Sequence, residues 1–102
     1  MHYANGRAAK LGDLVRGKGY NVKHEIIGRL ILAQPENSAC NCQVAYVGVS
    51  SAVSFASYIA PETGAWLPSS SFQVTASVEC GQLDAFVALD PNTGDVLPPE
   101  TA

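Results

Sequence analysis

The chain has 102 residues, of which 47% are hydrophobic and 15% charged, and its formal net charge is −3. This length suits one domain with a modest core, and the composition excludes a disordered chain. No apolar run approaches the roughly 20 residues of a membrane span, and the first ten residues lack the apolar core of a secretory signal, so we expect a cytoplasmic protein.

Positive charge is confined to the first part of the chain. Residues 1–29 carry six cations and two acids, whereas residues 30–102 carry seven acids and no Lys or Arg. Such segregation can steer an anionic partner to one end of a molecule, or the acidic part can fold over the basic part and neutralise it. Both interpretations remain open at this point.

The first predicted strands follow a short N-terminal arm and a tight turn at Asn5-Gly6. Residues 13–16 alternate as a half-buried strand, and residues 17–21 form a polar loop. Residues 24–33 are apolar on both faces, which suits a strand crossing the centre of a barrel. Gly28 marks the point where we expect that strand to bend or bulge.

A third strand is predicted over residues 40–49, after a turn at 34–38. Residues 50–71 show no sustained period, so we expect a long loop there. Residues 72–80 alternate without error, which predicts one buried and one wet face, the buried face carrying Phe72, Val74, Ala76, Val78 and Cys80.

The end of the predicted domain is less regular. Residues 83–89 fit a last strand, although a single helical turn fits the spacing nearly as well. After a turn at 90–94, the remaining residues predict an extended end that frays. The pattern as a whole predicts one all-β domain over residues 1–90, a small barrel of five to six antiparallel strands, with a flexible acidic tail at 91–102.

One stretch resembles known proteins. Residues 3–15, YANGRAAKLGDLV, resemble the opening of many short uncharacterised bacterial and phage-encoded proteins. The continuation to residues 27–31, IGRLI, resembles the KOW-type half of an SH3-like barrel. The resemblance covers residues 3–33 and implies an SH3-like fold. For a phage-encoded protein, it also implies a location in the virion.

Three cysteines, Cys40, Cys42 and Cys80, allow three interpretations. A metal site with His24 is disfavoured because structural zinc sites space their cysteines two to four apart in two pairs. A disulfide is disfavoured by the odd count and the expected reducing compartment. We therefore expect all three to be free thiols in the core, with no metal and no cofactor.

The sequence contains no arrangement typical of catalysis. A nucleophile needs a base within hydrogen-bond reach, and the two histidines lie in the N-terminal arm and beside a strand. Residues 48–52, GVSSA, lack the closing glycine of a nucleophile elbow, and residues 90–95 do not fit a calcium loop. We expect a protein that is not an enzyme.

Two kinds of partner remain. The 50–71 segment holds more large apolar side chains than a small barrel can bury, which predicts a protein interface at Phe55, Tyr58, Trp66 and Leu67. The leading hypothesis is therefore a self-associating interaction or assembly module of phage or prophage origin, without a membrane partner. The alternative is a nucleic-acid-binding barrel that uses the basic hairpin 16–29, with Arg16, Lys18, Lys23 and Arg29 for phosphates and Tyr20 for stacking.

Overall fold

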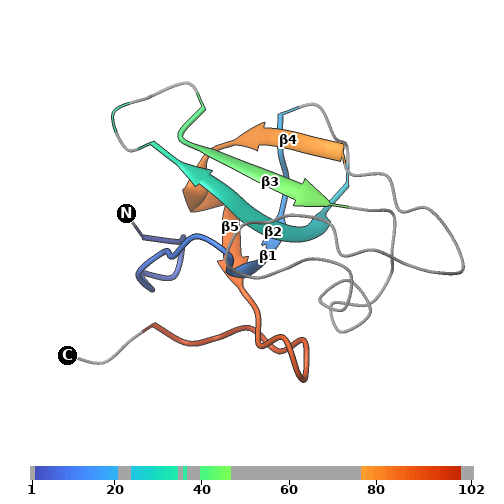
Figure 1. Ribbon diagram of the computed structural model, residues 1–102. Helices are drawn as coiled ribbons and strands as arrows, with labels where there is room; N and C mark the ends of the chain where they lie inside the picture. The colour runs from blue at the N-terminus through green and yellow to red at the C-terminus, as the bar shows by residue number, and fades with distance from the viewer. Residues whose placement is uncertain (1, 21–23, 35, 37–39, 47–76, 100–102) are drawn as a thin grey trace, which may run out of the picture.

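A computed structural model describes residues 2–20, 24–34, 36, 40–46 and 77–99 (Figure 1). They form one antiparallel sheet in the order β4-β3-β2-β1-β5. Its elements are β1 (Leu14–Gly17), β2 (Ile26–Ala33), β3 (Cys42–Tyr46), β4 (Ser77–Gly81), a 3₁₀ turn η1 (Leu83–Ala85) and β5 (Phe86–Ala88). The all-β prediction is confirmed, but the sheet is not closed into a barrel, since β4 and β5 are its two edges.

The central strand β2 carries Gly28 at a point of close approach. Gly28 pairs with Val15 on one side and Tyr46 on the other. A Cβ atom at this position would collide with the carbonyl oxygen of Ala45 and a methyl group of Val44. The expected irregularity comes later, because the β2–β3 register shifts between Leu30 and Leu32. Gly28 therefore serves close strand packing, and the bulge lies elsewhere.

The hydrophobic core lies on one face of the sheet. Val15, Leu30, Val44 and Phe86 are each at most 1% exposed and contribute one large side chain from each of four strands. Burying each such side chain stabilises the fold by about 1.5–3 kcal/mol. The remaining members of this core are Tyr3, Ile26, Cys42, Leu83 and Ala88.

The alternation predicted for residues 72–80 is present in β4, but its phase is reversed. Val78, expected inside, is 56% exposed, whereas Glu79, expected in solvent, is 5% exposed. Glu79 pairs with the core residue Val44 and therefore shares its face. The opposite face receives Cys80, whose sulfur bonds to Cys40. Residues 72–76 lie outside the described part of the chain.

The end of the chain is more structured than the sequence suggests. Residues 83–89 contain both predicted alternatives, since η1 leads directly into β5. Residues 96–98, expected in a flexible tail, are held by hydrogen bonds: Leu97 N–H donates to the Ala88 carbonyl at 2.9 Å, and the Arg7 guanidinium donates to the Pro98 carbonyl at 2.8 Å. Leu97 also packs against the core.

In the described residues there is no helix long and apolar enough to cross a membrane.

Candidate functional site

The residues predicted for a protein interface, Phe55, Tyr58, Trp66 and Leu67, lie outside the described part of the chain, as does Lys23 of the basic hairpin. Their roles stay predictions. The other four residues of the basic hairpin are described, and the structure separates them into two groups.

Arg29 lies inside the molecule. It is 5% exposed, and its Nη1 donates to the Gly12 carbonyl at 2.9 Å. Burial lowers the pKa of this guanidinium, and the nearby Asp13 carboxylate partly opposes that shift. Arg29 therefore attaches the turn before β1 to β2 and does not present its charge at the surface.

The other hairpin residues are accessible. Arg16 Nε lies 3.8 Å from Glu25 Oε2, and both side chains are substantially exposed. Lys18 is exposed, and the neighbouring Tyr20 is 56% exposed. Lys18 and Tyr20 are therefore an exposed cation and an exposed aromatic ring two positions apart in the chain.

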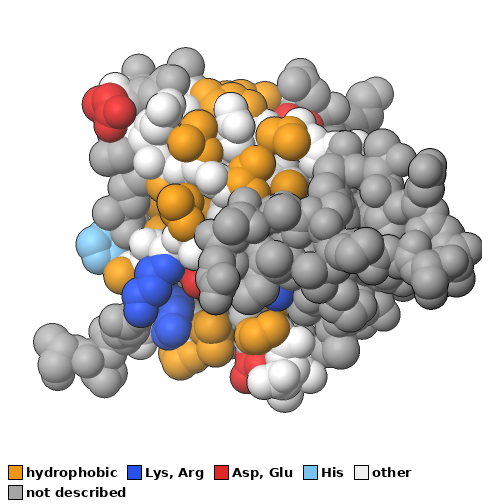
Figure 2. Space-filling view, viewed as in Figure 1, with side chains coloured by type: hydrophobic (Ala, Val, Ile, Leu, Met, Phe, Trp, Pro, Cys, Tyr) orange, Lys and Arg blue, Asp and Glu red, His pale blue; other side chains and the backbone are white. Residues whose placement is uncertain are grey.

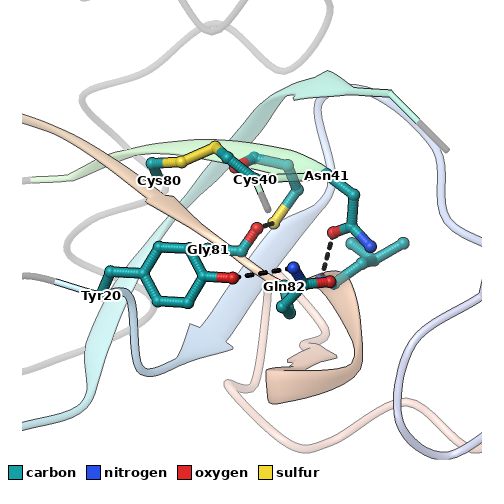
Figure 3. Close-up of a disulfide and its surroundings, with 8 residues drawn as sticks. Tyr20, Cys40, Asn41, Cys80, Gly81 and Gln82 are labelled. Carbon is teal, nitrogen blue, oxygen red and sulfur yellow. Dashed lines mark hydrogen bonds between the residues drawn. A yellow bond between two sulfur atoms is a disulfide. The ribbon is translucent and has the colours of Figure 1, made fainter. Parts of the chain in front are cut away.

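A disulfide joins Cys40 to Cys80, which corrects the prediction that both are free thiols (Figure 3). Their Cα atoms are 5.7 Å apart, within the range that a disulfide spans. Cys40 precedes β3 and Cys80 lies in the edge strand β4, so the bond ties the start of β3 to the sheet edge. The odd number of cysteines argues against a pairing in the sequence, and spacing alone does not reveal that residues 40 positions apart meet.

Tyr20 is held against the residues that follow the bridge. Its N–H donates to the Cys80 carbonyl at 3.0 Å, and its hydroxyl accepts a hydrogen bond from Gln82 Nε2 at 2.7 Å (Figure 3). The preceding Gly19 lies so close to β4 that a Cβ atom there would collide with the Glu79 side chain. We call Tyr20, Cys40, Cys80, Gly81 and Gln82 the disulfide corner.

The third cysteine stays a buried free thiol, as predicted. Burial raises the pKa of Cys42 to about 11, and its thiol donates to the Gly81 carbonyl at 3.5 Å. Cys42 pairs with Gly81 whereas Gln43 pairs with Cys80, so Cys42 and Cys80 point to opposite faces of the sheet. The Cys42 thiol is therefore protonated at neutral pH and directed away from the disulfide.

Among the described strands β4 pairs only with β3, and its other edge begins beside this corner. The Cys80 carbonyl points away from β3 toward Tyr20, so by the period of a strand the main-chain groups of Val78 point to the same edge. The side chain of Val78 is 56% exposed. Figure 2 shows hydrophobic side chains in several groups, with Lys or Arg side chains between the upper and the lower groups.

A second polar cluster, which we call the N-terminal turn, contains Tyr3, Lys10, Gly12, Asp13 and Arg29. The Tyr3 hydroxyl donates to Asp13 Oδ2 at 2.6 Å, and the Lys10 N–H donates to the same oxygen at 3.0 Å. Burial and the Asp13 carboxylate raise the pKa of Tyr3. This cluster is a structural attachment, since its groups bond to one another.

Among the described residues, no group of three or more His, Cys, Asp or Glu side chains is arranged to hold a metal ion. No protein-family model, curated protein or solved structure matches this chain.

Proposed function

We propose that this chain is a non-enzymatic interaction or assembly module of phage or prophage origin, which self-associates through the edge of β4. The observation that carries the proposal is the exposed apolar side chain of Val78 on β4, which is an edge strand among the described residues. Exposed edge strands are templates for pairing with another chain.

The proposal includes an SH3-like barrel as the scaffold. The proposed barrel is partly open, since β5 pairs with β1 but not with β4 among the described strands, and this leaves the β4 edge available to a second copy. Two observations support a curled sheet. A Cβ atom on Gly81 would lie 3.2 Å from the Phe86 ring, and the segment after β1 reaches β4 through the Tyr20–Cys80 hydrogen bond.

A second copy of the chain fits the β4 edge by symmetry. If two β4 strands pair antiparallel about a two-fold axis at Val78, the two valines lie opposite each other, as an isologous interface requires. Glu79 of one copy then lies opposite Ser77 of the other, so no like charges meet. Main-chain hydrogen bonds and contact between the valines stabilise the pair.

Light scattering coupled to size exclusion, over about a tenfold concentration range, tests this proposal. We expect a discrete dimer or larger oligomer that Val78→Lys converts to a monomer, because a lysine at an edge strand opposes pairing. Val96→Lys is the matched control, since Val96 is also exposed, at 43%, but lies in the C-terminal segment. A monomeric parent protein, or a Val78→Lys variant with the parent mass, would contradict the proposal.

The alternative function is nucleic-acid binding by the basic hairpin 16–29. It is favoured by the neighbouring Lys18 and Tyr20, which offer a phosphate contact and a stacking surface. Fluorescence anisotropy with short DNA and RNA tests it. Binding that weakens steeply with salt, and that Lys18→Glu with Lys23→Glu abolishes while Lys10→Glu does not, would favour this alternative over self-association.

A further inference from the structure

The residue that forms the disulfide on β4 also holds the surface tyrosine. Cys80 bonds to Cys40 through its sulfur and accepts the Tyr20 N–H through its carbonyl. Two residues further on, Gln82 donates to the Tyr20 hydroxyl. Both attachments of Tyr20 therefore depend on residues 80–82, which Cys40 ties to the start of β3.

The same corner is anchored a second time through Asn41. Its Oδ1 accepts the Leu83 N–H at 2.6 Å, and its carbonyl accepts the Gln34 N–H at 2.7 Å. The chain on each side of the bridge is thus bound by hydrogen bonds that do not need the sulfur–sulfur bond. Opening the bridge removes the covalent tie, so that hydrogen bonds alone hold residues 80–82 in place.

The bridge lies nearer the surface than the remaining thiol. Cys40 and Cys80 are both partly exposed residues, as attack by a small thiol requires. Cys42 is 1% exposed on the opposite face, and a protonated thiol is a poor nucleophile. An opened bridge therefore re-forms between Cys40 and Cys80, and Cys42 does not capture either sulfur.

We propose that the Cys40–Cys80 disulfide is a redox-controlled clasp that fixes Tyr20 on β4 when closed and releases it when opened by a small-molecule thiol. The first thiolate attacks one sulfur of the bridge and forms a mixed disulfide, and the other cysteine leaves as a thiolate and takes up a proton. A second small thiol then attacks the mixed disulfide. The products are two cysteine thiols and one oxidised small-molecule disulfide, so two electrons pass to the protein.

The effect on association rests on the proposed function, but the clasp itself does not. With the bridge open, β4 still pairs with β3, while its C-terminal end is free to open locally. Tyr20 then loses protection, and the ordered edge beside Val78 is no longer fixed. We expect the oxidised protein to associate more tightly than the reduced one.

Amide hydrogen exchange followed by NMR tests the clasp without any partner. The Tyr20 amide is compared with the Gly12 amide, which donates to the Leu30 carbonyl at 2.8 Å in the N-terminal turn. On reduction with dithiothreitol, we expect the protection of Tyr20 to fall by about tenfold or more relative to that of Gly12. The Cys40→Ser, Cys80→Ser variant should behave as the reduced protein does.

Three results would overturn the clasp. One is three reactive thiols, rather than one, in denatured protein purified without reductant. The second is Tyr20 protection that reduction leaves unchanged, and the third is a loss at Tyr20 no larger than that at Gly12, which would leave only the general loss of stability expected when a bridge is removed. If Tyr20 protection falls but the solution mass is the same in both states, the clasp stands and its effect on association is ruled out.

Discussion

The disulfide corner and the N-terminal turn both fasten a loop to the sheet, but with different chemistry. At the corner, a covalent bond ties Cys80 to Cys40, and one main-chain and one side-chain hydrogen bond hold Tyr20 against residues 80–82. At the turn, side chains do this work: Tyr3 bonds to Asp13, and Arg29 bonds to the Gly12 carbonyl. The first attachment responds to thiols and leaves polar surface accessible. The second depends on a buried charge, and its polar groups bond to one another and not to a partner.

The largest expected effect comes from removing the bridge. Cys40 and Cys80 are separated by 40 residues, so Cys40→Ser with Cys80→Ser should lower the free energy of unfolding by about 4 kcal/mol through the entropy of the unfolded chain. Urea denaturation measures the change, and reduced parent protein is the control that should match the variant. Equal stability of the variant and the oxidised parent would show that the disulfide does not stabilise the fold.

Arg29→Ala tests the other region and should lower the free energy of unfolding by about 3 kcal/mol. The variant loses the packed stem of the side chain, leaves the Gly12 carbonyl without its donor and removes a cation from beside Asp13. Arg16→Ala is the matched control, because its ion pair with Glu25 is exposed and should contribute at most about 1 kcal/mol. Similar losses in the two variants would show that the burial of Arg29 is not decisive.

Alkaline pH should weaken both regions, because Cys42 beside the corner and Tyr3 in the turn both have raised pKa values. The unfolded Cys42 thiol, with a pKa of 9.0, loses its proton before the folded thiol does at about 11. Stability should therefore fall as pH rises from 9 to 11, by about 2–3 kcal/mol from this group.

Urea midpoints measured from pH 7 to 11 check this dependence. Cys42→Ala should be less stable at neutral pH but show a shallower loss above pH 9. Tyr3→Phe should reduce the fall of the urea midpoint with pH only above pH 10, which is the ordinary pKa of the phenol. An unchanged slope in Cys42→Ala would assign the alkaline loss to other groups.

The smallest effect concerns the hydrogen bond between Gln82 and Tyr20. It is exposed, so its coupling energy in a double-mutant cycle of Gln82→Ala and Tyr20→Phe should be about 0.5 kcal/mol. If the coupling exceeds that of the Tyr3–Asp13 pair, the contrast between an accessible corner and a buried turn does not hold.

The sequence predicts a strand well where the hydrophobic pattern of the segment matches the burial of its side chains in the fold. The expected segments 13–16, 24–33 and 40–49 contain most of β1, β2 and β3. It fails for β4, because alternation gives the period of a strand but not which face meets the core. Which face of β4 meets the core depends on the bond between Cys80 and Cys40 and on the close approach of Gly19 to the Glu79 side chain.

The candidate site is predicted only in part. Lys18 and Tyr20 are exposed as the hairpin pattern suggests, but an arginine in a sequence is read as a surface residue, and the burial of Arg29 follows from its contact with Gly12. The disulfide corner was missed because its members come from three separate segments. Only the folded chain brings Tyr20, Cys40 and Cys80 together.

The contacts near the two ends of the described chain make a practical design available. Asn5 Nδ2 donates to the Leu97 carbonyl at 3.0 Å and Arg7 donates to that of Pro98, so residues 2–8 and 96–98 lie side by side, on the side of the sheet away from β4 (Figure 1). A short peptide linker could join them and yield a circular permutant. Surface immobilisation through either segment would likewise leave the β4 edge facing the solution.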